Sequence, residues 1–135
     1  MKAFIDASVI LAALGSKSGG SSEVLKLLKQ REHAGVVSQA VIEEVFRNAH
    51  KIKITENEVH NLIIKSSLEI VQAPASGDVE KYSNVFSKDA HVIASAVKSK
   101  SAVIITLDKR HLLSQKIKGL KMLTPGEFLK DLKVK

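Results

Sequence analysis

The chain alternates between short apolar runs and longer segments with helical periodicity. These mainly apolar runs, most of which contain Val or Ile, lie at 3–5, 35–37, 68–71, 102–105 and 120–123. Apolar residues recur three or four positions apart, as in amphipathic helices, within 8–14, 23–31, 38–50, 55–67, 89–97, 109–117 and from 125 onward. Residues 78–85 are expected to form a short helix or a turn. Strands that alternate with helices in this way predict a parallel sheet with helices on both faces. We therefore expect an α/β fold, a three-layer α/β/α sandwich.

Local signals predict where three of the helices begin. Ser38 is a candidate N-cap for the helix that runs to about residue 50. Thr55 and Glu58 have the spacing of a capping box, in which each side chain bonds the other residue's backbone N–H. The same spacing recurs at Thr124 and Glu127, with a Pro at the first helical position between them.

Length and composition narrow the protein class. With 135 residues the chain has the size of one domain, so we expect a single domain over 1–135. The absence of Cys excludes disulfides and thiolate metal sites. The longest apolar run, 9–14, is too short to cross a bilayer and the N-terminus lacks a signal-peptide layout, so we expect a cytoplasmic protein with no membrane partner. The net charge of +7 makes nucleic acid the first partner class to consider, although lysine-rich surfaces also serve solubility.

Three aspartates occupy unusual places in this pattern. Asp6 directly follows the first apolar run, and Asp108 follows the run at 102–105. Asp89 lies on the apolar stripe of its helix, one turn before Val92. Ligands of open parallel sheets bind outside the carboxyl ends of the strands, so we expect these carboxylates to converge there. Asp89 and Asp108 each have a structural alternative as helix N-caps, whereas burial of Asp6 costs free energy unless it is paired or liganded.

A fourth acid comes from the helix that Ser38 opens. Glu43 and Glu44 flank its apolar face on opposite sides at similar distances, so periodicity does not choose between them. Clustered carboxylates without Cys or paired His favour a hard cation such as Mg²⁺ or Mn²⁺. An acidic, metal-binding pocket on a basic protein is the arrangement that hydrolysis of a phosphodiester requires.

Four segments carry a family resemblance: FIDASV at 4–9, SQAVIEEV at 38–45, KDAHVIASA at 88–96 and VIITLDKRHL at 103–112. Together they resemble a PIN domain, of the kind found in VapC-type toxin ribonucleases. The resemblance implies a metal-dependent endoribonuclease whose catalytic and metal-binding residues are Asp6, Glu44, Asp89 and Asp108. It selects Glu44 over its neighbour because the family's glutamate comes six residues after the Ser that opens this helix.

The resemblance also implies supporting roles. Ser8 and Thr106 match small polar positions that line the site and hydrogen-bond a metal-bound water or an acidic neighbour. Many relatives carry a further acid or an aromatic residue soon after the last Asp, where this chain has Lys109, Arg110 and a His. We therefore expect one metal ion and leave a second open. The candidate RNA contacts are Lys109, Arg110, Arg47 and Lys51.

The partners implied by the resemblance are RNA, a second copy of the chain in a homodimer, and an antitoxin protein whose basic or hydrophobic segment covers the acidic pocket. The main alternative is a non-catalytic PIN-like module that binds RNA or protein. A binding module without catalytic activity has no reason to keep four acidic residues that repel one another. A phosphoaspartyl phosphatase would need a second acid two residues after Asp6, where this chain has Ser8.

Overall fold

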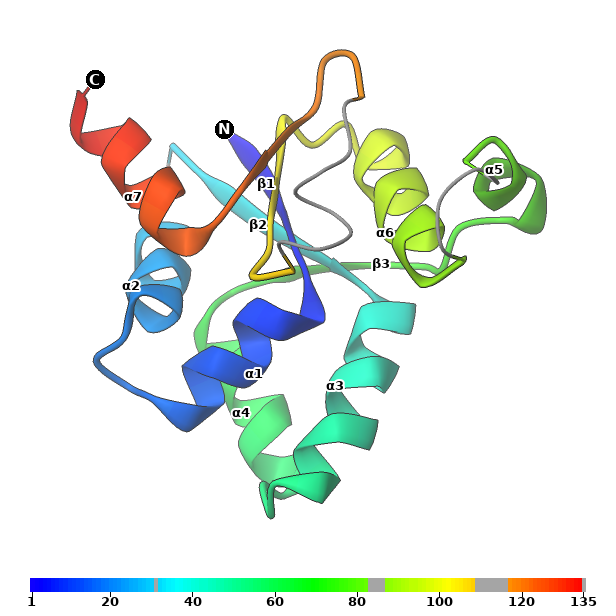
Figure 1. Cartoon of the computed structure of the whole chain (residues 1–135). Coiled ribbons are helices and arrows are strands. Elements are labelled where there is room, and N and C mark those ends of the chain that lie inside the picture. The colour runs from blue at the N-terminus through cyan, green and yellow to red at the C-terminus, as the bar shows by residue number, and fades with distance from the viewer. Residues whose placement is uncertain (31, 83–86, 109–116, 135) are drawn as a thin grey trace.

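Five strands form one parallel sheet in the order β3-β2-β1-β4-β5 (Figure 1). The computed structural model describes the whole chain except residues 31, 83–86, 109–116 and 135. The strands are β1 (Lys2–Ile5), β2 (Ala34–Ser38), β3 (Glu69–Val71), β4 (Val103–Ile105) and β5 (Lys121–Leu123). Every neighbouring pair is parallel. Each apolar run of the sequence thus contributes a strand, and the predicted parallel sheet is confirmed.

Helices cover both faces of this sheet (Figure 1). The helices are α1 (Ala7–Gly15), α2 (Gly20–Leu27), α3 (Gln39–Lys51), α4 (Glu56–Lys65), α5 (Ser76–Glu80), α6 (Ser87–Lys98) and α7 (Pro125–Val134). Helix α6 packs against β1 and β4 and carries α5 on its outer side. Helices α1, α2, α3, α4 and α7 pack against one another on the opposite face. The α/β/α architecture predicted from the sequence is therefore confirmed.

The core lies between the central strands and the two helical layers. Phe4, Ile5, Ile104 and Ile105 are fully buried, as expected for parallel strands covered on both faces. The edge strand β3 is different, because Ile70 is 51% exposed. The central strands β1, β2 and β4 are therefore covered on both faces, and β1 and β4 end next to predicted site residues.

The predicted helix starts are confirmed by their hydrogen bonds. The Ser38 Oγ accepts from the Val41 N–H at 3.1 Å. The capping box of α4 is complete, with the Glu58 N–H donating to Thr55 Oγ1 at 3.2 Å and the Thr55 N–H donating to Glu58 Oε2 at 2.7 Å. The reciprocal bonds at Thr124 and Glu127, at 3.1 and 2.9 Å, open α7.

Several helix boundaries differ from those expected, most clearly in α2, which also ends at Leu27 instead of 31, and in α5. Helix α2 begins at Gly20 instead of 23, because Ser22 is buried and its hydroxyl bonds the Ser16 carbonyl, which ties the start of α2 to the end of α1. Helix α5 begins at Ser76, two residues earlier than expected, and ends at Glu80. Most of the helix predicted at 109–117 lies outside the described residues.

Candidate active site

The strand register brings Asp6 and Thr106 together. Strands β1 and β4 pair with Ile5 opposite Ile105, and the Asp6 N–H donates to the Ile105 carbonyl at 3.0 Å. The next residue of each strand is therefore at the same level, at the carboxyl edge of the sheet. Asp6 is only 4% exposed and Thr106 is fully buried. This edge is where the sequence predicted the carboxylates to gather.

Two hydroxyl groups hold the Asp6 carboxylate. Ser8 Oγ donates to Asp6 Oδ2 at 2.7 Å, and Thr106 Oγ1 donates to the same oxygen at 2.8 Å. Each hydroxyl also accepts a backbone N–H, from Leu107 at 3.0 Å for Ser8 and from Asp108 at 2.9 Å for Thr106. No Lys or Arg of the described residues is within 4.0 Å of this carboxylate. Asp6 is thus a buried anion whose described side-chain partners are neutral hydroxyls.

Asp89 is the third residue of α6 and lies inside its first turn. The helix begins at Ser87, so Asp89 is not its N-cap. Its side chain is 1% exposed and shares the helix's buried stripe with Val92, Ile93 and Ala96. Because α6 packs against β1 and β4, this stripe contributes a second buried carboxylate to the layer above those strands.

The two glutamates of α3 differ in their surroundings. Glu43 is exposed, whereas Glu44 is half-buried. Glu44 lines an open hollow of about 680 Å³ together with Arg47, His50 and Lys51. The structure therefore distinguishes two glutamates that periodicity did not, because Glu44 is the less exposed of the two.

Asp108 follows Thr106 by two residues and is half-buried. Its backbone N–H is held by the Thr106 hydroxyl, so the turn after β4 is anchored to the same pair of hydroxyls as Asp6. The N–H groups of Leu107 and Asp108 also take part, and no sequence pattern signals them because their direction depends on the conformation of this turn. Lys109, Arg110 and the helix that Asp108 was a candidate to cap lie outside the described residues.

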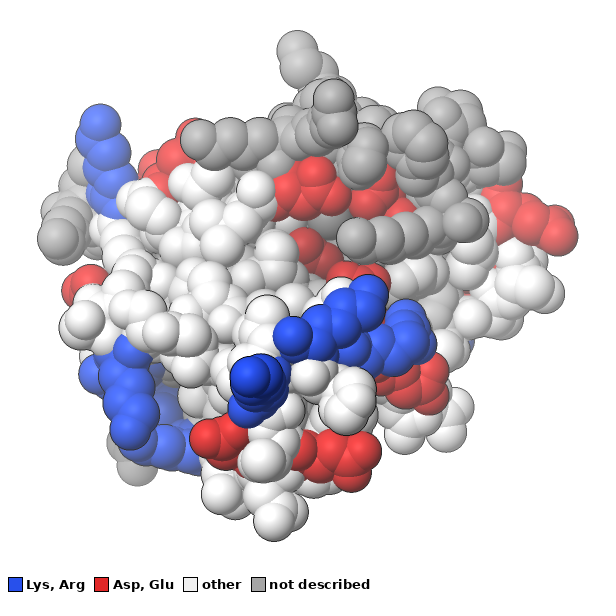
Figure 2. Space-filling view, turned by 60° about the horizontal axis from the view of Figure 1, so that its bottom comes forward, with Lys and Arg blue, Asp and Glu red and all other residues white. Residues whose placement is uncertain are grey.

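Acidic side chains gather in the middle of the face that contains this edge, with Lys and Arg side chains beside them (Figure 2). Across the described part of the chain, no group of three or more His, Asp or Glu side chains is arranged to hold a metal ion. The donor chemistry nevertheless fits a hard cation. Asp6 and Asp89 are both more than nine-tenths buried and offer only oxygen, the ligand that Mg²⁺ and Mn²⁺ prefer.

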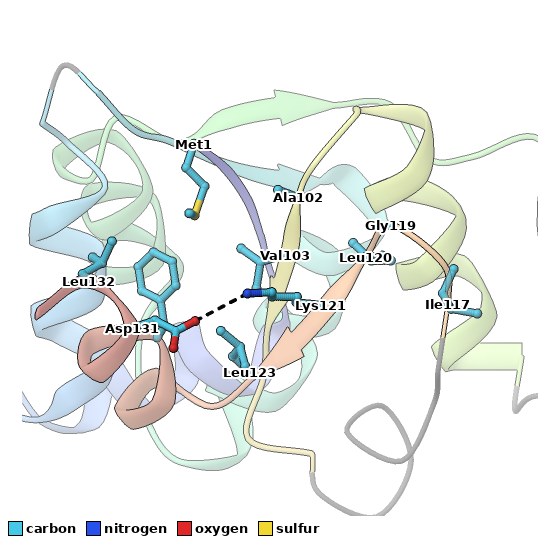
Figure 3. A pocket seen from close by; sticks show the side chains of 11 residues that line it. Met1, Ala102, Val103, Ile117, Gly119, Leu120, Lys121, Leu123, Asp131 and Leu132 are labelled. Atoms are coloured by element: carbon cyan, nitrogen blue, oxygen red, sulfur yellow. Dashed lines mark ion pairs between the residues drawn. The ribbon is translucent and has the colours of Figure 1, made fainter. Parts of the chain in front are cut away.

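A separate cavity of about 600 Å³ lies between β4, β5 and α7 (Figure 3). Its lining is mainly apolar and includes Val103, Leu120, Leu123 and Leu132, and none of the four predicted acids contributes to it. In the ranges that the structure describes, no helix combines the length and apolarity that crossing a membrane requires.

Comparison with known families identifies the kind of domain to which this sheet belongs. The sequence model of the PIN domain matches residues 3–116, which is most of the chain and includes Asp6, Glu44, Asp89 and Asp108. The chain belongs to the PIN domain family. PIN domains are typically nucleases and generally depend on metal ions. The family predicted from the four sequence segments is confirmed.

Solved structures show the same PIN fold at low sequence identity. PAE2754 from Pyrobaculum aerophilum is similar with a TM-score of 0.71 and 20% identity, covering 100% of this chain and 97% of that one. DNA-bound VapBC from Salmonella typhimurium is similar with a TM-score of 0.66 and 17% identity, covering 93% and 98%. The Mycobacterium tuberculosis toxin VapC20, which cleaves the sarcin-ricin loop, is similar with a TM-score of 0.56 and 14% identity, covering 76% and 86%. Comparison with curated protein sequences gives no significant match.

Proposed function

We propose that this PIN domain is a metal-dependent endoribonuclease that hydrolyses RNA phosphodiester bonds with Asp6, Glu44, Asp89 and Asp108. The observation that carries the proposal is the state of Asp6, which is 4% exposed at the carboxyl edge of the sheet and held by hydroxyls alone among the described side chains. Burying a carboxylate without a cation costs several kcal/mol, on the order of the penalty for a desolvated ion. A ligand that brings positive charge to this edge offsets that cost.

Mg²⁺ or Mn²⁺ is the cation that this oxygen donor set would hold, with Asp6, Asp89 and Asp108 as ligands and Glu44 completing the set. When bound, the ion activates a water molecule and neutralises charge on the phosphate. The protein's own contribution is to keep Asp6 in one orientation through Ser8 and Thr106.

Substrate RNA would be bound by basic side chains next to Glu44. Arg47 and Lys51 are exposed on α3 and line the same hollow as Glu44, three and seven residues further along the helix. Residues at these spacings share a helix face. Their positive charges can therefore bind the phosphate backbone while the scissile phosphate approaches the acidic edge. Lys109 and Arg110, which follow Asp108 in the sequence, are proposed to extend this contact.

The experiment that tests the proposal is cleavage of a mixed structured RNA by metal-stripped protein, with Mg²⁺ or Mn²⁺ added back. An Asp89→Asn variant purified identically is the matched control, because the change removes the charge and keeps the shape. We expect metal-dependent cleavage by the wild-type protein and not by the variant, with products that carry a 5′-phosphate and a 3′-hydroxyl. Equal cleavage by both preparations would indicate a contaminating nuclease, and no cleavage by either would contradict the proposal.

We further propose that the protein is the toxin of a toxin-antitoxin pair and forms a homodimer. The support is structural similarity to solved toxin-antitoxin complexes, including one from Klebsiella pneumoniae at 22% identity. A cytoplasmic location and a single domain over 1–135 belong to the same proposal. Sedimentation of the purified chain tests the dimer, and growth arrest on expression of the wild-type but not the Asp89→Asn chain tests the toxin.

A non-catalytic binding module is the second candidate, and a groove of about 420 Å³ between α1, α2 and α4 favours it. The floor of the groove includes Leu14, Leu25 and Leu62. Four exposed lysines line the groove, and none has an acidic partner within 4.0 Å in the described part of the chain: Lys17, Lys26, Lys29 and Lys65. An acidic amphipathic segment of a partner protein complements such a surface. Binding of RNA or protein without any metal-dependent cleavage would favour this function.

A further inference from the structure

The two hydroxyls on Asp6 have defined hydrogen-bond directions. A backbone N–H can only donate, so the Ser8 hydroxyl accepts from Leu107 and the Thr106 hydroxyl accepts from Asp108. An ionised carboxylate can only accept, so each hydroxyl gives its single proton to Asp6 Oδ2, at 2.7 and 2.8 Å. The two hydroxyl oxygens are 3.4 Å apart, too far for a strong bond between them.

Both protons therefore reach the same carboxylate oxygen. The described residues donate two short hydrogen bonds to Oδ2 and none to Oδ1 of Asp6. Rotation of the carboxylate would break bonds to Thr106, which is fully buried and has no access to replacement water. Asp6 is thus fixed with one oxygen committed to the protein and the other available to a ligand.

We propose that Ser8 and Thr106 are positioning residues that select small octahedral cations over Ca²⁺ by restricting Asp6 to coordination through one oxygen. This inference rests on the proposed metal site. Mg²⁺ requires a near-octahedral shell and takes one oxygen from each carboxylate, together with water. Ca²⁺ accepts more ligands, of the order of 6–8, and often uses both oxygens of a carboxylate. Because Oδ2 of Asp6 accepts two hydroxyl protons, Oδ1 is the oxygen left for a metal ion. One oxygen is enough for Mg²⁺, whereas Ca²⁺ loses the second carboxylate oxygen that it often uses.

A purely structural role for the hydroxyls predicts a different result. Buried carboxylates are normally hydrogen-bonded, and satisfying Asp6 contributes to stability whichever ion binds. In that case, loss of the hydroxyls lowers the melting temperature and reduces the affinity for every divalent cation by the same factor. Selection between cations separates the two roles, because only the positioning role changes the ratio of affinities.

The test is calorimetric titration of metal-stripped protein with Mg²⁺, Mn²⁺ and Ca²⁺, beside thermal melting without metal. The variants are Ser8→Ala, Thr106→Val, the double variant, and Thr106→Ser, which keeps the hydroxyl. We expect the ratio of Ca²⁺ to Mg²⁺ affinity to rise by about tenfold in the double variant, the lower end of the range for outer-shell residues. Thr106→Ser should keep the wild-type ratio. If Thr106→Val does not fold, the inference is tested with Ser8→Ala alone, for which we expect a smaller rise in the ratio of Ca²⁺ to Mg²⁺ affinity.

Equal loss of affinity for all three ions in a folded variant overturns the inference and leaves the nuclease proposal intact. An unchanged ratio in the double variant has the same meaning. If the wild-type protein binds none of the ions, both this inference and the metal site fail. RNA cleavage by the wild-type protein with Mg²⁺ is measured in parallel, so that failure of the proposed function is recognised separately.

Discussion

Two charged regions of this molecule are built in opposite ways. At the carboxyl edge of β1, Asp6 is buried and its described side-chain partners are hydroxyls. At the cavity between β5 and α7, Lys121 and Asp131 form an ion pair at 3.9 Å with side chains that are 70% and 49% exposed (Figure 3). Water and a partner already balance the charges of this ion pair, whereas Asp6 has no Lys or Arg within 4.0 Å among the described residues. The difference indicates where a ligand binds: a buried charge without a counter-charge favours a ligand, and a solvated ion pair does not.

From this comparison we expect the largest effect when Asp6 is replaced by Asn, and we expect it on the rate of RNA cleavage. RNA cleavage with Mg²⁺ should fall by more than the roughly 10- to 100-fold that loss of an outer-shell residue costs, because a ligand itself is changed. The melting temperature without metal should stay the same or rise, because the amide removes a buried charge. Cleavage rates and thermal melting of the same preparations measure both. A variant that is strongly destabilised without metal would show that the carboxylate is balanced within the protein.

Metal binding should stabilise the wild-type protein and not Asp6→Asn. An ion at 100 times its dissociation constant adds about 2.7 kcal/mol to the free energy of unfolding. Denaturant unfolding with and without Mn²⁺ measures this difference, and Lys121→Ala serves as a variant that should respond like the wild type. Equal stabilisation of Asp6→Asn would place the bound ion elsewhere in the protein.

A smaller effect should separate the two adjacent glutamates of α3. Glu44→Gln should lower cleavage by about tenfold, as expected for a weakened metal site. Glu43→Gln should leave the rate unchanged, because Glu43 is exposed and Glu44 is half-buried. The two substitutions are chemically identical and one residue apart, so cleavage kinetics of both give a matched comparison. Equal rates in the two variants would remove Glu44 from the site.

The smallest effect should follow from breaking the exposed ion pair. Lys121→Ala should change the free energy of unfolding by less than about 1 kcal/mol, because exposed ion pairs contribute little. Cleavage should be unaffected, since the pair lines a cavity to which none of the four acids contributes. Chemical denaturation tests the first statement. A loss of several kcal/mol would mean that the pair organises the packing of α7.

Much of the fold was predictable because its signals are local. The caps at Ser38, Thr55 and Thr124 act between residues three positions apart, so the sequence contains both partners of each bond. The burial of Val92 and Ile93 likewise follows from helical spacing. The predicted start of α2, at residue 23, was wrong because the observed start depends on a hydrogen bond from Ser22 to the end of α1.

The candidate site divides in the same way. The sequence by itself determined the alternation of strands and helices, the family, and the position of Asp6 and Asp108 at strand ends, because these follow from periodicity and short motifs. Only the tertiary structure decided that Ser8 and Thr106, 98 residues apart, bond one oxygen of Asp6. It also decided that Glu44 is half-buried while Glu43 is exposed. The physical reason is that hydrogen-bond direction and burial at this edge depend on strand register and helix packing, which join residues that no local pattern relates.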